Sequence, residues 1–343
     1  MLGRALDRVG PEFPDLRLTL LTSAGGAADV APRRMEVRLP AGPLKLVGAG
    51  PGRIALEQTL ACLSHGDLLH FFDLSGPVLA PSRPFTTTIH DAGVARGFGR
   101  RSYTYKRQLC PWALRRARAA VAVSAFAQDE AVRHFGGDSA KIRVIHSGPG
   151  LEPVERVGDD PDGGLPFLLY VGNLGVNKNL PFLIAAFERS GAPGDLVLAG
   201  RASEPVDGLQ SAIASSSVSD RVRVVADATD RDIEGLYRRA TALVLPSRYE
   251  GFGFPPLEAM ARGCPVLASD IPALREISGQ GALLLPLDDS EAWAQAMRRI
   301  SEDERLRADL RDKGAATVAR YSWDETARGL CRLFVDVLDK AGN

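Results

Sequence analysis

Residues 242–270 read ALVLPSRYEGFGFPPLEAMARGCPVLASD, and the fold prediction starts from this stretch. A short apolar run, ALVLP, is followed by a glycine-punctuated loop, a helix-patterned segment and a second apolar run, PVLAS. Short β-rich runs that alternate with helices need crossover connections, which give parallel strands covered on both faces. The helix is expected to open at Pro255 or Pro256, because the fixed φ of proline suits a first turn. Asp270 is expected to cap the next helix, at 272–277.

The same alternation extends on both sides of this stretch. In the second half the other β-rich runs are PFLLYVG (166–172), DLVLAG (195–200), RVRVV (221–225) and ALLLP (282–286). In the first half they are LRLTLLTS (16–23), DLLHFFD (67–73), FTTTIHD (85–91), AAVAVS (119–124) and KIRVIHSG (141–148). The segment 150–166, rich in Gly, Pro and Asp, is typical of a linker. The sequence therefore predicts α/β architecture with a doubly wound domain on each side of a linker.

Length and composition agree with this prediction. The chain has 343 residues, which is about twice the usual length of one domain. Its 45% hydrophobic and 24% charged residues are typical of a globular protein. The 42 Lys and Arg balance 42 Asp and Glu, which excludes the broad positive surface of a non-specific nucleic-acid binder. We expect no nucleic-acid partner.

The cysteines and apolar runs predict a soluble cytoplasmic protein. No C-x-x-C pair occurs among the four cysteines, so they indicate buried thiols of a reducing compartment rather than a zinc cluster or a redox dithiol. They are Cys62, Cys110, Cys264 and Cys331. No run approaches the roughly 18 apolar residues of a membrane span, and the start MLGRALDRVG lacks the apolar part of a signal peptide.

One glycine motif, GAGPGR (48–53), imitates a dinucleotide-binding loop, with Asp73 at the end of the next strand. Its third glycine position holds Arg53, however, and the run before it contains Lys45 and makes a poor buried strand. We favour a plain Gly/Pro loop over cofactor binding.

The loop before the helix at Pro255 carries the chemistry, because loops at the carboxyl edge of an open α/β sheet bind ligands. Gly251 and Gly253 let backbone N–H groups point at a ligand, and the helix N-terminus suits a phosphate. Glu250 and Glu258 suit polyols, since a carboxylate can accept two hydrogen bonds from a vicinal diol. A sugar nucleotide combines a diphosphate with two polyols. The alternative is a pair of acids favoured by the helix dipole, which explains Glu250 poorly because a glycine-rich turn separates it from the helix.

These residues resemble the E-x7-E motif of family 4 retaining glycosyltransferases. The resemblance extends strongly to YVGNLGVNKNLPFLIAAF (170–187), VLAGRAS (197–203) and IPALREISGQGALLLPLDD (271–289), and more weakly to TIHD (88–91), residues 121–148 and YSWDETA (321–327). It covers almost the entire chain. It implies an α/β GT-B fold, in which two Rossmann-like doubly wound domains face each other across a cleft. The implied boundaries are an acceptor-side domain at 1–155, a nucleotide-sugar domain at 156–320, and a helix at 321–343 that packs back toward the first domain.

The resemblance also implies residue roles. Glu258 would hold the ribose hydroxyls of the donor and Glu250 its hexose, near the leaving phosphate. Lys178 would neutralise the diphosphate, helped by the N–H groups of Gly251, Phe252, Gly253 and Phe254. His90, at the end of a strand of the first domain, would face the transferred sugar, although a lone histidine is more often a surface or core residue. The leaving diphosphate itself would deprotonate the acceptor. Because Lys178 and the helix end would supply the positive charge, neither a metal nor a cofactor is expected.

The chain departs from the family pattern in three places. Asn173 stands where an arginine commonly follows the glycine turn, and Asn177 replaces the usual basic neighbour of Lys178. Arg201, after the next strand, is the nearest replacement for the missing charge. The usual first strand and glycine-rich loop are absent before LGRALDRVGPEFPDLRLTLL, which indicates either a start assigned too far downstream or a damaged protein. We favour the former.

Residues 92–128 contain no acidic residue. Their cations are Arg96, Arg100, Arg101, Lys106, Arg107, Arg115, Arg116 and Arg118, and they are interleaved with Tyr103, Tyr105 and Trp112. One interpretation is that residues 96–118 contact anionic lipid at the inner face of the membrane, or a lipid-diphosphate acceptor. The other is a solvated helix face.

The function implied is that of a retaining, metal-independent hexosyltransferase. By family analogy it would move mannose from GDP-mannose to a polysaccharide or lipid-linked glycan acceptor. The same fold also serves sugar phosphorylases and epimerases. A catalytically impaired relative that acts as a carbohydrate-binding or scaffold partner is the main alternative.

Overall fold

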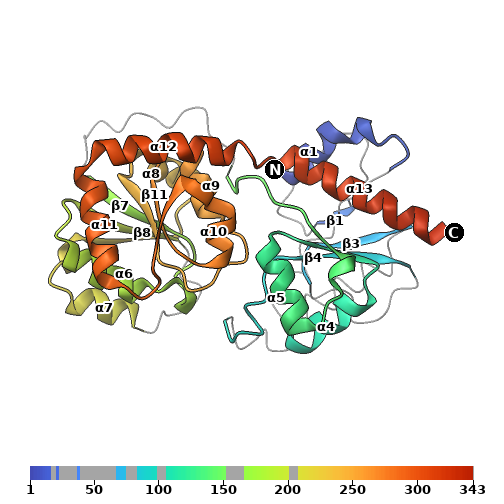
Figure 1. The fold of residues 1–343 in the computed structure, drawn as a ribbon, viewed down its shortest axis with the longest axis horizontal. Helices are drawn as coiled ribbons and strands as arrows, with labels where there is room; N and C mark the ends of the chain where they lie inside the picture. Colours follow the sequence, from blue (N-terminus) through green and yellow to red (C-terminus); the bar gives the residue numbers. More distant parts are fainter. Residues whose placement is uncertain are drawn as a thin grey trace. The chain divides into compact units, whose positions relative to one another are not determined.

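The computed structural model describes residues 1–16, 21–22, 37–38, 67–74, 83–98, 106–151, 166–200 and 208–342. The chain divides into two compact units, Met1–Gly148 with Ser322–Asn343 and Pro149–Tyr321 (Figure 1). The glycine motif at 48–53 and Cys62 lie outside the described residues.

The unit Pro149–Tyr321 is built on a six-stranded sheet in the order β12-β11-β10-β7-β8-β9. Its strands are β7 (Phe167–Val171), β8 (Asp195–Gly200), β9 (Val222–Ala226), β10 (Ala242–Leu245), β11 (Val266–Ser269) and β12 (Ala282–Leu285). Every neighbouring pair is parallel. All residues of β10 and β11 are buried, as expected when helices cover both faces of a parallel sheet. The predicted doubly wound α/β class is confirmed.

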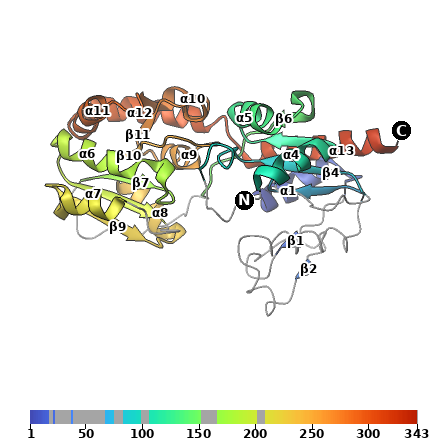
Figure 2. The ribbon, with the colours of Figure 1, turned by 90° about the horizontal axis from the view of Figure 1, so that it is seen from below.

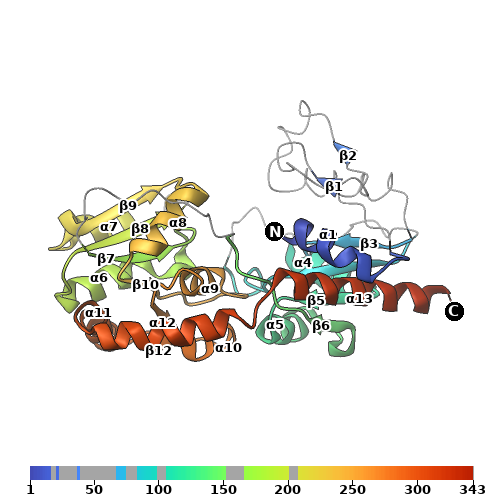
Figure 3. The same ribbon diagram turned by 90° about the horizontal axis from the view of Figure 1, so that it is seen from above.

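Helices connect these strands. They are α6 (Leu180–Ser190), α7 (Leu209–Ser215), α8 (Asp230–Arg239), α9 (Phe254–Met260), α10 (Pro272–Ser278), α11 (Ser290–Glu302) and α12 (Glu304–Val318), with short 3-10 turns η4 (Val176–Lys178), η5 (Ser219–Arg221) and η6 (Gly279–Gly281). Helix α6 packs against α11, and α9 packs against α12. Figure 3 shows α12 beside β12 at one edge of the sheet, and Figures 2 and 3 both show α7 beside β9 at the other.

The two expected helix starts differ from the structure in detail. Helix α9 begins at Phe254, so Pro255 and Pro256 both lie in its first turn, where no intrahelical N–H bond is lost. Helix α10 begins at Pro272 with Ile271 as its N-cap. The predicted capping by Asp270 is wrong, because its carboxylate instead accepts a hydrogen bond of 2.8 Å from Arg275 Nε.

The strand order changes direction between β7 and β10. From β7 the chain moves outward through β8 and β9, then returns to form β10 on the other side of β7. Neighbouring strands whose connections lead in opposite directions leave a ligand-binding crevice at their carboxyl ends. The loops after β7 and β10 therefore frame the expected binding position, and they carry Lys178 and Glu250.

The other unit holds a four-stranded parallel sheet in the order β3-β4-β5-β6. Its elements are α1 (Leu2–Val9), η1 (Gly10–Glu12), β3 (Leu69–Phe71), β4 (Phe85–Ile89), α4 (Lys106–Arg116), β5 (Ala119–Ala122), α5 (Ala125–Phe135), η3 (Ser139–Lys141), β6 (Ile142–Val144) and α13 (Trp323–Gly342). A separate parallel pair joins β1 (Leu21–Thr22) to β2 (Val37–Arg38). All five residues of β4 are buried, and His90 follows directly.

Helix α13 shares the core of this unit and runs alongside α1 (Figure 3). A first apolar cluster joins the two helices and contains Ala5, Leu6, Val9, Ala327 and Cys331. A second cluster joins α13 to β5 and contains Val121, Leu330, Leu333 and Phe334. The last helix therefore completes a core formed by residues more than 200 positions away.

Candidate functional site

The loop after β7 brings Lys178 to the carboxyl edge of the sheet. A Cβ added to Gly200 at the end of β8 would lie 1.7 Å from the carbonyl oxygen of Gly172. The backbones at Gly172 and Gly200 can therefore approach this closely only because residue 200 has no side chain. The loop then forms η4, and Asn179 takes a left-handed φ of 58° before α6 begins. Lys178 is the last residue of η4 and is largely buried.

Lys178 and Glu250 form an ion pair across the change in strand order. Lys178 Nζ donates to Glu250 Oε1 at 2.6 Å, and Ser247 Oγ donates to the same oxygen at 2.7 Å. The two charged side chains are only 11% and 13% exposed. No described residue donates a hydrogen bond to Oε2, which leaves that oxygen available to a ligand hydroxyl.

Asn177 joins the same two loops. Its Nδ2 donates to the carbonyl oxygen of Tyr249 at 3.2 Å, and its own carbonyl accepts from the backbone N–H of Arg248 at 2.8 Å. The position where family members usually carry a basic residue thus serves here to fix the Glu250 loop beside the Lys178 loop.

Tyr170 lies beneath this pair on β7 and is fully buried. Burial raises the pKa of its hydroxyl well above the usual value, and the nearby charge of Glu250 raises it further. The hydroxyl donates to the carbonyl oxygen of Asn173 at 2.6 Å, which holds the turn after β7.

Glu258 lies within α9 and has different partners. Tyr237 on α8 donates its hydroxyl to Glu258 Oε2 at 2.9 Å. Burial raises the pKa of Glu258, while this hydrogen bond and the charge of Arg262 lower it and the charge of Asp230 raises it. Glu258 as a whole residue is 7% exposed. Glu250 and Glu258 therefore have different partners, Lys178 and Ser247 for Glu250 and Tyr237 for Glu258.

The segment between the two acids packs tightly against the rest of the unit. Gly253 has φ 110°, and a Cβ there would meet Leu274 Cδ2 at 2.8 Å, so glycine is required. The rings of Phe252 and Phe254 are 5.0 Å apart, and Phe252 also contacts Tyr321 edge to face at 6.2 Å. The phenylalanines thus anchor the loop, while a role for its N–H groups, including that of Gly251, stays a prediction.

The structure places the other predicted ligands differently. Asn173 is exposed, and its Oδ1 accepts from the backbone N–H of Gly175 at 3.3 Å, so its side chain closes a local turn. Arg201 lies outside the described residues.

His90 belongs to the other unit and is exposed at the end of β4. Its Nε2 donates to the carbonyl oxygen of Phe72 at 2.8 Å, which fixes the orientation of the ring. His70 lies nearby on β3, with Nδ1 2.8 Å from Thr86 Oγ1 and Nε2 3.0 Å from Thr88 Oγ1. Burial, reinforced by the charge of His90, lowers the pKa of His70 to about 3. His70 is a neutral core residue, whereas the role of His90 stays a prediction.

The basic stretch 96–118 is only partly a free positive surface. Arg96 pairs with the buried Glu130 of α5, and Lys106 pairs with Asp73 at 2.6 Å. Besides Arg96, the exposed cations of the described part are Arg107, Arg115, Arg116 and Arg118. Arg116 lies 5.4 Å from the ring centre of Trp112. Arg100, Arg101, Tyr103 and Tyr105 are outside the described residues.

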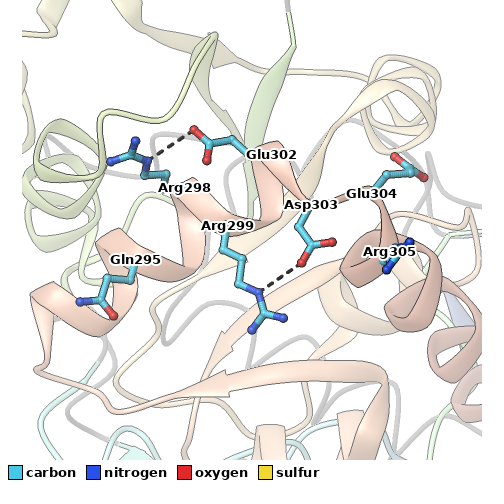
Figure 4. A pocket seen from close by; sticks show the side chains of 7 residues that line it. All are labelled: Gln295, Arg298, Arg299, Glu302, Asp303, Glu304 and Arg305. Atoms are coloured by element: carbon cyan, nitrogen blue, oxygen red, sulfur yellow. Dashed lines mark hydrogen bonds and ion pairs between the residues drawn. The ribbon is translucent and has the colours of Figure 1, made fainter.

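A surface hollow of about 540 Å³ lies at the junction of α11 and α12 (Figure 4). Its lining consists of Gln295, Arg298, Arg299, Glu302, Asp303, Glu304 and Arg305. Arg298 pairs with Glu302 and Arg299 with Asp303, each at 3.4 Å. Because acidic and basic side chains balance and pair locally, this hollow does not suit a diphosphate, and the carboxyl edge of the sheet is the better candidate.

In the ranges given above, no helix combines the length and apolar character that a membrane crossing requires. The same ranges contain no cluster of three or more His, Cys, Asp or Glu side chains placed to bind a metal ion.

Sequence and structure comparisons agree with one another. Residues 154–317 match the family described as Glycosyl transferases group 1, and residues 15–151 match Glycosyltransferase Family 4. The O-antigen chain mannosyltransferase RfbU of Salmonella typhimurium strain LT2 is 30% identical over 64% of this chain and 60% of that protein. Glycogen synthase of Mycobacterium tuberculosis strain H37Rv is 30% identical over 78% of this chain and 68% of that protein. The chain thus spans about three-fifths of the length of the mannosyltransferase.

The solved structure of sucrose-phosphate synthase from Thermosynechococcus elongatus aligns with 99% of this chain and 92% of its own, with a TM-score of 0.77 and 23% identity. Two Rossmann-like units with parallel sheets, together with this likeness, define a GT-B fold. The chain belongs to glycosyltransferase family 4.

Two residues that donate hydrogen bonds to the candidate acids, Ser247 and Tyr237, were not predicted from the sequence. Ser247 stands three positions before Glu250 in the quoted motif, and a hydroxyl so close to a candidate carboxylate is a signal that could have been used. Tyr237 lies 21 positions before Glu258, with a whole strand between them, so no local pattern links the two.

Proposed function

We propose that this protein is a retaining glycosyltransferase that transfers a hexose from a nucleotide sugar to a glycan acceptor. The observation that carries the proposal is the Lys178–Glu250 pair, with its 2.6 Å contact, at the carboxyl ends of β7 and β10 in a family 4 chain. A cation beside a carboxylate with a free oxygen fits a diphosphate attached to a sugar.

Each acid and the lysine receive a distinct task in this proposal. Lys178 stabilises negative charge on the leaving diphosphate, which is where charge develops during transfer. Glu250 Oε2 accepts a hydroxyl of the hexose, and Glu258 accepts the ribose hydroxyls. The proposal includes no resident metal or cofactor, since Lys178 supplies positive charge. His90 is proposed to contact the transferred sugar through Nδ1.

For the donor we propose mannose carried by GDP, and for the acceptor a polysaccharide or lipid-linked glycan. The name of RfbU, an O-antigen chain mannosyltransferase, supports this choice. The glycogen synthase name of another relative makes glucose carried by a nucleotide the competing donor.

A donor screen by thermal shift tests the proposal. Because a ligand that binds only the folded state stabilises it, GDP-mannose at 100 times its Kd is expected to add about 2.7 kcal/mol and to raise Tm by about 5 °C or more. UDP-glucose and ADP-glucose serve as comparisons. Release of nucleoside diphosphate in the presence of a glycan acceptor then separates an enzyme from a carbohydrate-binding scaffold. The proposal is overturned if none of the three donors shifts Tm.

We also propose that the exposed arginines of α4, Arg107, Arg115 and Arg116, together with Arg118 just after it, contact anionic lipid. Vesicles containing phosphatidylglycerol are expected to sediment the protein, and vesicles of phosphatidylcholine are not. Replacing Arg107, Arg115 and Arg118 together by serine is expected to weaken this binding about 100-fold, because each basic residue near an anionic surface contributes about 1 kcal/mol. The matched control replaces three exposed arginines of the other unit, Arg189, Arg275 and Arg298. Equal binding to both vesicle types contradicts the idea.

A further inference from the structure

Tyr237 fixes one carboxylate oxygen of Glu258 by a hydrogen bond. It lies on the inward face of α8, together with Ile233 and Glu234, and its side chain is wholly buried. Its hydroxyl donates to Glu258 Oε2 at 2.9 Å. Burial raises the pKa of Tyr237 well above its usual value, with a further rise from the charge of Glu258, so the phenol stays a hydrogen-bond donor.

A buried ion pair fixes the same two helices to each other. Arg262, two residues after the end of α9, donates from Nε to Glu234 Oε2 at 2.6 Å, and both side chains are 1% exposed. Arg262 also donates to the backbone carbonyls of Glu258 and Leu151, each at 3.1 Å. The guanidinium thus holds the main chain of Glu258 while Tyr237 holds its side chain.

Gly150 lies against the other carboxylate oxygen of Glu258, Oε1. A Cβ added to Gly150 would lie 1.9 Å from Glu258 Oε1 and 3.1 Å from Phe254 Cδ1. Gly150 is not among the glycines with positive φ, so its backbone would accept alanine and the conflict is steric alone. No described residue donates a hydrogen bond to Oε1. Tyr237 therefore fixes Oε2, whereas Oε1 lies against Gly150 and accepts no hydrogen bond from the described residues.

We propose that Tyr237 and Gly150 are positioning residues that hold Glu258 Oε1 ready to accept the ribose hydroxyls of a nucleoside diphosphate. This inference rests on the proposed function, in which Glu258 contacts ribose. Neither residue contacts the ligand. Tyr237 orients the carboxylate and stabilises its charge, and Gly150 leaves room for Oε1.

The test compares GDP with 2′,3′-dideoxy-GDP in titration calorimetry. Wild-type protein is expected to prefer GDP about tenfold, because one hydrogen bond to a charged group is worth roughly this factor. Tyr237→Phe and Gly150→Ala are each expected to reduce the preference to about twofold or less, with little change in the affinity for the dideoxy form. If Tyr237 and Gly150 had only a structural role, the substitutions would lower the affinity for both nucleotides equally. Tyr321→Phe, another buried tyrosine of the same unit, is the matched control and is expected to keep the preference.

The pH dependence gives a second readout. The groups that face the Glu258 carboxylate are Tyr237 and Asp230 of α8 and Arg262 after α9. A donor to the charged form lowers a carboxyl pKa, so its loss in Tyr237→Phe raises the pKa of Glu258. As pH falls, the variant is therefore expected to lose its preference for GDP at a higher pH than wild-type protein does.

The outcomes separate the two proposals. If wild-type protein binds neither GDP, UDP nor the dideoxy form, the proposed function fails and this inference fails with it. If wild-type protein prefers GDP over the dideoxy form and both variants keep the full preference and its pH profile, the inference alone fails. It also fails alone if wild-type protein binds both forms equally. Should Tyr237→Phe not fold, Gly150→Ala decides the matter by the same comparison.

Discussion

Replacing Glu250 by alanine is expected to lower the rate of sugar transfer by about 100- to 1,000-fold, the usual cost of removing one preorganised group that acts on the transition state. The change removes the carboxylate proposed to accept a hydroxyl of the hexose. It also removes the partner of Lys178 Nζ, which in the unchanged protein donates to Glu250 Oε1 at 2.6 Å. A lysine without its partner can move within its largely buried position, so the diphosphate is also held less well. The measurement is kcat and KM for nucleoside diphosphate release from the donor found in the thermal-shift screen.

Two controls make this result specific. Glu302→Gln changes an exposed acid of the hollow shown in Figure 4 and is expected to leave both constants unchanged. Ser247→Ala removes a neutral donor to Glu250 Oε1 but keeps the ion pair, so a loss of about tenfold or less is expected. If Glu250→Ala retains more than half of the wild-type rate while folding normally, the role assigned to Glu250 is wrong.

Replacing Arg262 by alanine is expected to lower the free energy of unfolding of the unit Pro149–Tyr321 by about 3–5 kcal/mol, because it leaves the carboxylate of Glu234 buried without this cation. The same change removes the hydrogen bonds to the carbonyl oxygens of Glu258 and Leu151. Since a chain with two units need not unfold in one step, amide hydrogen exchange in β10 and β11 is the appropriate measurement. Protection there reports this unit alone.

Arg238 provides a matched control on the same carboxylate. It donates to Glu234 Oε1 at 2.8 Å from a side chain that is 44% exposed. Exposed ion pairs contribute about 1 kcal/mol or less, so Arg238→Ala is expected to cost no more than that. Equal losses for the two variants would show that burial does not decide the strength of the Arg262 pair.

Most of the fold was predictable from sequence because its signals are local. Each β-rich run of the second half, from PFLLYVG to ALLLP, became a strand of the six-stranded sheet. A buried parallel strand needs a continuous apolar run, and that requirement is written in neighbouring residues. The helix starts were less well predicted. Asp270, for example, was expected to cap a helix but pairs with Arg275, because several hydrogen-bond partners lie within reach of one side chain.

For the site, the sequence determined which residues are chemically suited to a sugar nucleotide: Lys178 after one glycine turn, Glu250 and Glu258 around another, each following an apolar run. Only the tertiary structure decided that Lys178 pairs with Glu250, that Asn177 joins their loops, and that Tyr237, Arg262 and Gly150 surround Glu258. The reason is physical. Strand and helix formation depend on the period of nearby side chains, whereas these contacts join separate βα units of the sheet and arise only when the strand order places them together.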